Sequence, residues 1–327
     1  MHALTQAIAK NRFAVFGRAG MDLFPDPPGT ATVDATRLEV GLGGSCANIA
    51  VGICKFGGQA SLITSVSDDA VGWYCIKQLE DYGVETGYVQ RITGEFRTSL
   101  AVYESRVENH QTVIYRNGAA DFQVTEDDVD QIDLTGFGGF ITSGTVFSAE
   151  PSRGAGFHAI GKASALGLPI IFDVDYRPYS WPSAQVASDV LSRVAAASDI
   201  IVGNDEEFGF MAGDIDLGLQ KARDLAATTA AIVVYKMGEK GAITFAGDEE
   251  IHTGIYPVTA LKPTGAGDSF MAGLLSGLAA GLDLEAAVLR GSACAAIVVA
   301  RPGCAPAMPD QVGLDAFLAN HPGPTPA

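Results

Sequence analysis

The residues whose types and spacing could do chemistry are concentrated in the segment 262–273, KPTGAGDSFMAG. A loop containing Gly265, Ala266 and Gly267 runs directly into an apolar helical pattern. The first amides of such a helix have no intrahelical partner, and with the helix dipole they attract an anion such as phosphate. Asp268 lies in the same turn, where its carboxylate could take a proton from a hydroxyl held beside that phosphate. These features suit phosphoryl transfer, although a helix cap and a tight turn would use the same residues.

A second glycine-rich loop, GLGGSCAN at 41–48, also precedes a helical pattern. Gly43 and Gly44 allow a small ligand to approach the backbone, and Asn48 could bind hydroxyl groups. A plain strand-to-helix turn would have the same glycines. Neither loop is a Walker loop, since no Gly-Lys-Ser/Thr follows, and Cys46 stands where a dinucleotide fingerprint has its third glycine.

The elements that must position these loops alternate between apolar strands and helices. The predicted strands are 13–16, 60–65, 139–142, 169–174, 199–202 and 231–235. The predicted helices are 47–56, 71–82, 153–166, 184–197 and 217–227. Continuously apolar strands are typical of a sheet buried on both faces. The alternation therefore predicts an α/β fold, with a mainly parallel central sheet between two layers of helices.

Two further segments, 97–103 and 112–116, alternate with the period of an exposed strand, and a polar turn at 108–110 separates them. With 36–40 they predict a small antiparallel sheet. A small sheet of this kind is marginal alone, so it should rest on a substrate or a partner subunit, which suggests a homodimer. We expect one domain over 1–327, with a lid from about 33–43 and 95–118 inserted in it and a flexible tail at 320–327.

Composition excludes several classes of function. The net charge of −17 disfavours a nucleic-acid or anionic-membrane partner. Five cysteines without a CxxC pair favour a reducing compartment. No signal peptide and no apolar run of roughly 18 residues are found, which predicts a cytoplasmic protein without membrane attachment. The five histidines are scattered without the spacing of a zinc site.

The two loops, in this order, resemble the paired signatures of the ribokinase (PfkB) family of carbohydrate kinases. The matching residues are Gly43 to Asn48, Gly57, Val66 to Asp69 and Gly72, then Thr264 to Phe270 and Gly273. The resemblance covers residues 13–308. It implies a ribokinase-like three-layer sandwich with a small β-sheet lid over a sugar site.

The resemblance also implies roles for particular residues. Asp268 would be the catalytic base, and the amides of Gly265, Ala266, Gly267 and Asp268 would form the anion hole. Asp22 would hold sugar hydroxyls together with Gly43, Gly44 and Asn48. ATP and Mg²⁺ would be the cofactors, with Asn204 and Glu207 acting on the metal through water. The nucleotide would also contact Lys236, Gly238, Gly241 and the segment from Ala293 to Val298.

Lys262 departs from the family pattern, which usually has an acidic residue at this position that helps bind a monovalent cation. Our hypothesis is that the Lys262 ammonium replaces that cation, so that activity does not require potassium.

Several segments are more similar to one subfamily, the 5-dehydro-2-deoxygluconokinases of myo-inositol breakdown. They include 16–22 (FGRAGMD), 172–181 (FDVDYRPYSW), and Cys304 with 307–309. A sugar acid needs guanidinium groups for its carboxylate. The candidates are Arg18 in the first strand-to-helix loop, Arg97 and Arg116 on the expected lid strands, and Arg177 after a strand; pairing with Asp173, Asp175 or Glu104 is the alternative.

The predicted reaction is ATP-dependent phosphorylation of the terminal 6-hydroxyl of a sugar acid, 5-dehydro-2-deoxy-D-gluconate. One alternative is a kinase of the same type for 2-keto-3-deoxygluconate, fructose or ribose. Another is a non-catalytic sugar-binding sensor, because function depends on the site and not on the fold.

Overall fold

The computed structural model describes residues 2–106 and 109–326. Its nine-stranded sheet has the order β13-β12-β11-β10-β9-β8-β1-β4-β5. The seven strands from β11 to β5 in this order are parallel, while β12 and β13 at one edge are antiparallel. The strands are β1 (Arg12–Phe16), β4 (Gln59–Ser67), β5 (Val89–Ile92), β8 (Gly139–Ser143), β9 (Ile170–Asp173), β10 (Ile200–Asn204), β11 (Ile232–Lys236), β12 (Ala242–Ala246) and β13 (Glu249–Thr253).

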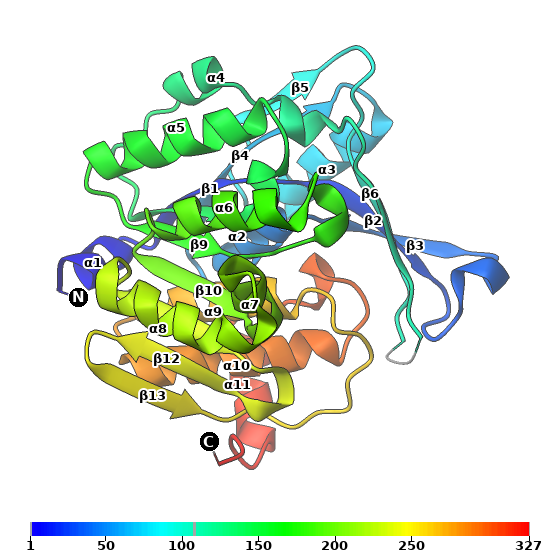
Figure 1. Cartoon of the computed structure of the whole chain (residues 1–327). Helices are drawn as coiled ribbons and strands as arrows, with labels where there is room; N and C mark the ends of the chain where they lie inside the picture. Colours follow the sequence, from blue (N-terminus) through cyan, green and yellow to red (C-terminus); the bar gives the residue numbers. More distant parts are fainter. Residues whose placement is uncertain (1, 107–108, 327) are drawn as a thin grey trace.

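Helices cover both faces of this sheet (Figure 1). The helices on one face are α4 (Glu126–Asp130), α5 (Ser152–Ala165), α6 (Ala184–Ala195), α7 (Asp205–Ala212) and α8 (Gly218–Thr228). The helices on the other face are α1 (His2–Ile8), α2 (Ser45–Lys55), α3 (Ala70–Asp81), α9 (Ala266–Ala279) and α10 (Leu284–Val299). Helix α11 (Gln311–Asn320) packs on α10. The predicted three-layer α/β architecture is confirmed.

Strand β1 shows why these apolar runs form buried strands. Ala14 and Phe16 pack into the core beneath α4 to α8, whereas Phe13 and Val15 pack into the core beneath α2 and α9. Successive side chains point to opposite faces of a strand, so a strand covered on both sides needs apolar residues at every position. All six predicted central strands are found within one or two residues of their expected ends.

The small sheet has four strands in the order β3-β2-β6-β7 (Figure 1). They are β2 (Gly20–Pro25), β3 (Leu38–Gly43), β6 (Leu100–Tyr103) and β7 (Thr112–Tyr115). Strand β2 was missed in the sequence, and it makes the sheet mixed, because it pairs antiparallel with β3 and parallel with β6. Arg18 therefore lies in a strand-to-strand connection instead of a strand-to-helix loop. Of the turn expected at 108–110, Glu108 lies outside the described residues.

The chain end, where a flexible tail was expected, contacts the segment after β13. The amide of Thr325 donates to the carbonyl of Ile255 (2.7 Å), and the amide of Ile255 donates to Thr325 Oγ1 (3.1 Å). The remaining elements are short 3₁₀ turns: η1 (Thr32–Asp34), η2 (Ala120–Gln123), η3 (Gly144–Ser148), η4 (Pro178–Ser180), η5 (Ile215–Leu217), η6 (Gly238–Lys240) and η7 (Ala305–Ala307). Among the helices described here, none combines the length and apolar character that crossing a membrane requires.

Candidate active site

The carboxyl ends of the parallel strands meet at one edge of the large sheet, and the N-terminus of α9 lies at this edge. Gly265 is the N-cap of α9 in the left-handed region (φ 83°), and no side chain caps the helix. The first amides of α9 therefore lack both an intrahelical partner and a side-chain acceptor. A Cβ atom at Gly267 would lie 3.3 Å from Nζ of Lys236, the last residue of β11. Backbone donors, a helix dipole and an ammonium group thus converge on one small region, as an anion site requires.

Asp268 lies in the first turn of α9 and is partly exposed. Its Oδ2 accepts a hydrogen bond from Asn48 Nδ2 of α2 (2.7 Å). Loss of solvation, together with the charge of Asp175, raises the pKa of Asp268 to about 6, although the bond from Asn48 opposes the shift. A carboxyl group with this pKa is ionised at neutral pH and remains basic enough to accept a proton.

Asp22 of β2 is a second buried carboxylate near α9. A Cβ atom at Gly43 would lie 2.0 Å from Asp22 Oδ1, so only glycine at 43 leaves room for this carboxylate. Burial raises the pKa of Asp22 to about 7 against the opposing charge of Arg18, and Asp268 adds to the rise. Oδ1 of Asp22 and Oδ1 of Asn48 are buried and have no hydrogen-bond partner among the described residues. Because buried polar atoms are normally paired, these two acceptors lack the partners that the hydroxyl groups of a ligand would supply.

The first glycine loop is fixed against the β1–β2 connection. Gly44 has a φ of 103°, and a Cβ atom there would lie 2.2 Å from the carbonyl oxygen of Arg18. The amide of Ala47 donates to the same carbonyl (3.3 Å). This contact holds the start of α2, and with it Asn48, next to β2.

Two acidic residues at the end of β9, Asp173 and Asp175, add to the carboxylates of the site. In the sequence they were considered only as ion-pair partners for arginine. Asp175 accepts from Ser45 Oγ (2.7 Å) and forms an ion pair with Arg177 Nη2 (2.9 Å). Burial acts to raise the pKa of Asp175, but Arg177 and Ser45 outweigh it, so the pKa lies below its usual value. Burial and the neighbouring Asp175 raise the pKa of Asp173 well above its usual value. The signal in the sequence was the pair of acids that directly follows a buried apolar run.

Asn204 and Glu207 form a capping box at the start of α7. The Glu207 amide donates to Asn204 Oδ1 (2.8 Å), and the Asn204 amide donates to Glu207 Oε2 (2.8 Å). Burial raises the pKa of Glu207, while Lys236 opposes the shift, so both residues lie on the same side of the site as the end of β11. Over residues 2–106 and 109–326, no three His, Cys, Asp or Glu side chains are grouped so that they could hold a metal ion.

The residues expected on the nucleotide side fall into two groups. Gly238 begins η6 after β11 and Gly241 is its C-cap, and both have positive φ angles (59° and 84°). Ala293 and Val298 of α10 are fully buried. Val298 supports the anion loop, because its Cγ1 would lie 3.3 Å from a Cβ atom at Gly265. Ala293 packs in an interior cluster and presents no side-chain surface to a ligand, in contrast to the sequence expectation.

Lys262 is buried beneath the anion loop. It is 1% exposed, and its Nζ donates to the carbonyl of Thr264. Burial lowers the pKa of Lys262, whereas Cys304, Asp268 and Asp22 oppose the shift. The ammonium group is therefore close to both carboxylates, at the position where the family pattern has an acid.

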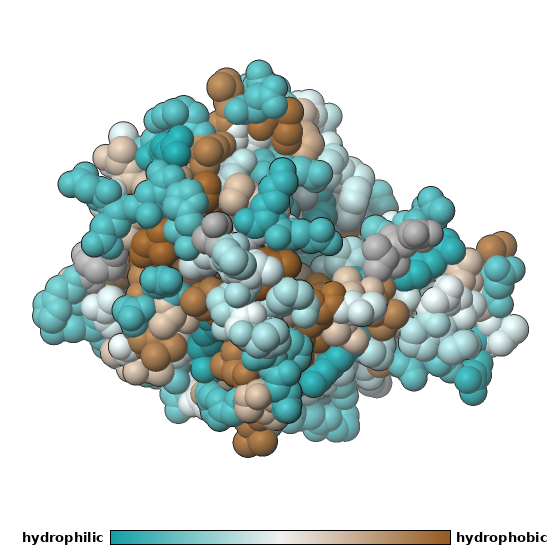
Figure 2. All heavy atoms as spheres, turned by 90° about the horizontal axis from the view of Figure 1, so that it is seen from below, coloured by the Kyte–Doolittle hydropathy of each residue, from teal (hydrophilic) through white to brown (hydrophobic). Residues whose placement is uncertain are grey.

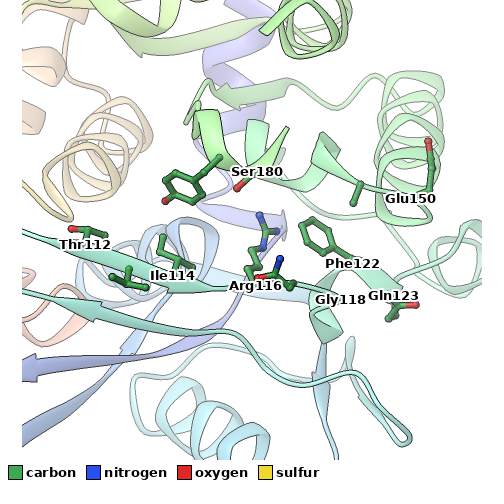
Figure 3. A pocket seen from close by; sticks show the side chains of 12 residues that line it. Thr112, Ile114, Arg116, Gly118, Phe122, Gln123, Glu150 and Ser180 are labelled. Atoms are coloured by element: carbon green, nitrogen blue, oxygen red, sulfur yellow. The ribbon is translucent and has the colours of Figure 1, made fainter. Parts of the chain in front are cut away.

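Arg116 follows β7 directly, and its charge is already neutralised. Its Nε donates to Asp121 Oδ2 (3.0 Å), its Nη2 binds the same oxygen, and its Nη1 donates to the Thr145 carbonyl (3.1 Å). The guanidinium also lies over the ring of Phe122, 4.0 Å from its centre. Figure 3 shows Arg116 in the wall of a pocket of about 520 Å³ between β7 and the segments at 149–150 and 179–180, and Asp268 is not part of its lining.

The other three candidate arginines differ in whether an acidic residue already pairs with them. Arg177 is paired with Asp175 (2.9 Å). Arg97 precedes β6, is 64% exposed, and binds the carbonyl of Gly94 and, at 3.8 Å, Asp69. The described contacts of Arg97 do not include Asp22, Asn48 or Asp268. Arg18 is buried in the site, and its Nη1 donates to Ser99 Oγ (2.9 Å).

Comparison with known proteins identifies the type of fold and site. The pfkB family carbohydrate kinases match residues 10–311. A 5-dehydro-2-deoxygluconokinase of Photobacterium profundum is 37% identical over 310 residues, covering 93% of each chain. The enzyme of the same name from Geobacillus kaustophilus is 32% identical over 314 residues, covering 94% of each. Among solved structures, a double-mutant fructokinase of Vibrio cholerae O395, bound to fructose, ADP and potassium, is 26% identical with a TM-score of 0.83, covering 94% of this chain and 98% of that one.

The three-layer fold, with an uncapped helix N-terminus beside a partly exposed carboxylate, agrees with the family that the comparisons identify. The chain belongs to the pfkB family of carbohydrate kinases. Within the family it is similar to the 5-dehydro-2-deoxygluconokinases.

Proposed function

We propose that this kinase transfers the γ-phosphate of ATP to the terminal 6-hydroxyl of 5-dehydro-2-deoxy-D-gluconate, with Asp268 as the base. The observation that carries the proposal is the position of the Asp268 carboxylate, in the first turn of a helix whose amides are uncapped. The proposal is also supported by the names of relatives that are 32% and 37% identical. A non-catalytic sensor would not need a partly exposed carboxylate with a pKa of about 6 at an anion site.

The residues of the site fit a nucleoside triphosphate directly and a metal ion only through water. The transferred phosphoryl group suits the loop of Gly265, Ala266 and Gly267, because the Lys236 ammonium group lies directly beside it. A Cβ atom at Gly267 would be 3.3 Å from Lys236 Nζ. Asn204 and Glu207 are occupied with each other, so they would reach Mg²⁺ only through water and phosphate. The metal supplies charge neutralisation between the phosphates. Solved structures of similar fold include a putative ribokinase II from E. coli in complex with ATP and Mg²⁺ (20% identical, TM-score 0.85).

In the proposed mechanism, the anion-loop amides and Lys236 stabilise charge on the transferring phosphoryl group. Asp22, Gly44 and Asn48 bind the hydroxyls of the sugar acid, using the two acceptors that have no partner among the described residues. Asp268 removes the proton of the 6-hydroxyl as that oxygen attacks. The small sheet acts as a lid that limits access of water.

Lys262 replaces the monovalent cation in this proposal. Its ammonium group is buried, binds the Thr264 carbonyl of the anion loop, and lies near Asp22 and Asp268. A fixed positive charge there would hold the loop as a bound potassium ion could. The fructokinase of Vibrio cholerae, in contrast, was solved with potassium bound.

We propose a second copy of this chain as the partner of the small sheet. The pairing registers place Val40, Leu23, Val102 and Val113 in one row across all four strands, on one face. A second row on that face consists of Leu42, Met21, Leu100 and Tyr115. Val40, Val113 and Tyr115 are 49%, 46% and 63% exposed. This sheet projects from the body (Figure 2), and an apolar face without charges is complementary to itself in a twofold dimer.

We propose that the enzyme acts without a nucleic-acid or membrane partner, as the net charge of −17 favours. We propose that the enzyme works in the cytoplasm, which agrees with five cysteines that are all free thiols.

The first prediction concerns the reaction itself. Purified protein with Mg²⁺-ATP should consume ATP fastest with 5-dehydro-2-deoxygluconate, among a panel that also contains 2-keto-3-deoxygluconate, gluconate, fructose and ribose. Asp268→Asn should lower kcat by about 10³-fold, because general-base catalysis contributes about 10²- to 10⁴-fold. Asp248→Asn, in the exposed turn between β12 and β13, is the matched control and should leave kcat unchanged. A preference for fructose or ribose would contradict the proposed substrate, and an active Asp268→Asn variant would contradict the base.

The second prediction concerns monovalent cations. Because Lys262 supplies a permanent charge, kcat/KM should differ by less than about 2-fold among sodium, potassium and tetramethylammonium buffers of equal ionic strength. Lys262→Met should lower kcat by about 10²-fold, the usual scale for removing one charge-stabilising group near a reacting phosphate or oxyanion. Strong activation of the unmodified protein by potassium would refute the role given to Lys262.

The third prediction concerns assembly. Light scattering coupled to size-exclusion chromatography should give twice the chain mass of 33.9 kDa. Val40→Lys should shift the protein to the monomer, because it places a charge within the apolar face. Val312→Lys, which changes an exposed valine of α11 outside that face, should leave the dimer intact. A monomeric unmodified protein, or a dimer unaffected by Val40→Lys, would show that the small sheet is not the interface.

A further inference from the structure

The four arginines proposed for the substrate carboxylate differ in whether the protein already supplies them with a counter-ion. Arg116 is bound by Asp121 through two nitrogens, and Arg177 is paired with Asp175. Arg97 is exposed, outside the carboxylate group. Each of these arginines therefore has either an internal anion or access to bulk water.

Arg18 has neither. Its residue exposure is 7%, and within the described part of the chain its guanidinium forms no ion pair at 4.0 Å or less. Its one hydrogen bond to a described residue goes from Nη1 to the neutral hydroxyl of Ser99 (2.9 Å). Burial acts to lower the pKa of Arg18, but Tyr103, Asp22, Asp121 and Asp175 outweigh it from beyond ion-pair distance, so the pKa lies above its usual value. A guanidinium group carries five N–H donors, so most of its hydrogen-bonding capacity is not used by the protein.

The position of Arg18 is fixed from several sides. Its carbonyl accepts from the Ala47 amide and lies against Gly44. A Cβ atom at Gly20 would lie 2.6 Å from Arg18 Nη1 and 2.7 Å from Ser99 Oγ, so glycine at 20 leaves room for this contact. The remaining nitrogens of the guanidinium are not among the fully buried polar atoms that lack a partner, so they keep some exposed surface. Because no described carboxylate pairs with them directly, these N–H donors can bind an anion that arrives from outside.

Arg18 also lies at a suitable place relative to the reacting end of the site. Asp22 responds electrostatically both to Arg18 and to Asp268. The Arg18 carbonyl accepts from the Ala47 amide, and the adjacent Asn48 donates to Asp268 Oδ2 (2.7 Å), so α2 links Arg18 to the reacting end. A linear sugar acid has its reacting hydroxyl and its carboxylate at opposite ends.

We propose that Arg18 is the residue that binds the substrate's carboxylate, and that it selects acidic over neutral sugars. This inference rests on the proposed function and deepens it. The planar guanidinium binds the carboxylate through two parallel N–H···O bonds, while Ser99 holds Nη1 in place. Arg116 and Arg177 then have a different role, because their ion pairs fix the positions of Asp121 and Asp175.

The test compares one substrate with its neutral counterpart. The unmodified enzyme and Arg18→Met are assayed with 5-dehydro-2-deoxygluconate and with the analogue whose carboxylate is reduced to a hydroxymethyl group. Arg18→Met should lower kcat/KM for the acid by about 100-fold, mainly through KM, because bonds to charged groups contribute on this scale. Turnover of the neutral analogue should change by less than about 3-fold, since a residue with a merely structural role would affect both substrates equally.

Three further variants make the result specific. Arg18→Lys keeps the charge but not the fork, and should recover part of the discrimination. Ser99→Ala should also lower the ratio of acid to neutral turnover, but by less than Arg18→Met does. It replaces Arg18→Met as the test if that variant does not fold. Arg97→Met removes an exposed arginine outside the site and should leave the ratio unchanged.

The possible outcomes separate the two proposals. If the unmodified enzyme phosphorylates the acid and Arg18→Met does so equally well, or loses both substrates in parallel, the role of Arg18 is refuted and the proposed function stands. If the unmodified enzyme prefers the neutral compound, the proposed substrate and the role of Arg18 both fail. Calorimetric titration of the acid into both proteins measures the same contact without turnover, and equal dissociation constants would also overturn the assignment.

Discussion

The structure depends on a balance between buried carboxylates and a few fixed cations around the N-terminus of α9. Asp173, Asp175 and Glu207 lie there because the parallel strands of the large sheet end at one edge, while Asp22 comes from β2 of the small sheet and Asp268 from α9 itself. Each carboxylate loses solvation in the interior, and the charge of its neighbours adds to the cost. Arg177 and Lys236 offset part of this cost, and Arg177 keeps Asp175 ionised. Asp268 remains at a pKa near neutrality, which is the property that a base for a sugar hydroxyl needs.

The two glycine loops make this arrangement possible although they are far apart in the chain. Asn48 and Asp268, separated by 220 positions, are joined by a hydrogen bond of 2.7 Å. Gly43 makes room for Asp22, and Gly265 adopts the left-handed conformation that starts α9 without a capping side chain. A larger residue at either position would displace a carboxylate or close the anion site. The same glycines that permit the turns thus determine where the polar groups lie.

Much of the fold could be predicted from the sequence, because strands buried on both faces are apolar at every position. The central strands at 13–16 and 139–142 were found on this basis and are present as β1 and β8. Strand β2 was missed because its residues, GMDLFP, lie directly after β1 and include Asp22, so they looked like a functional loop. The two glycine loops were recognised by their residues. The partners of the arginines could not be predicted, because a pairing such as that of Arg116 with Asp121 depends on where η2 folds back against β7.

If ionised Asp268 accepts the proton of the sugar hydroxyl, kcat/KM must depend on pH through the ionisation of this carboxyl group. The groups that face Asp268 are Asn48, Asp175, Arg177 and Lys236, and Asp22 titrates in the neighbouring position with a pKa of about 7. With 5-dehydro-2-deoxygluconate and saturating Mg²⁺-ATP, the account predicts a plateau above about pH 7.5. Below about pH 6, kcat/KM should fall with a slope that approaches tenfold per pH unit as Asp268 becomes protonated. A rate that stays constant down to pH 5, or that rises on acidification, would contradict the assignment of Asp268 as the base.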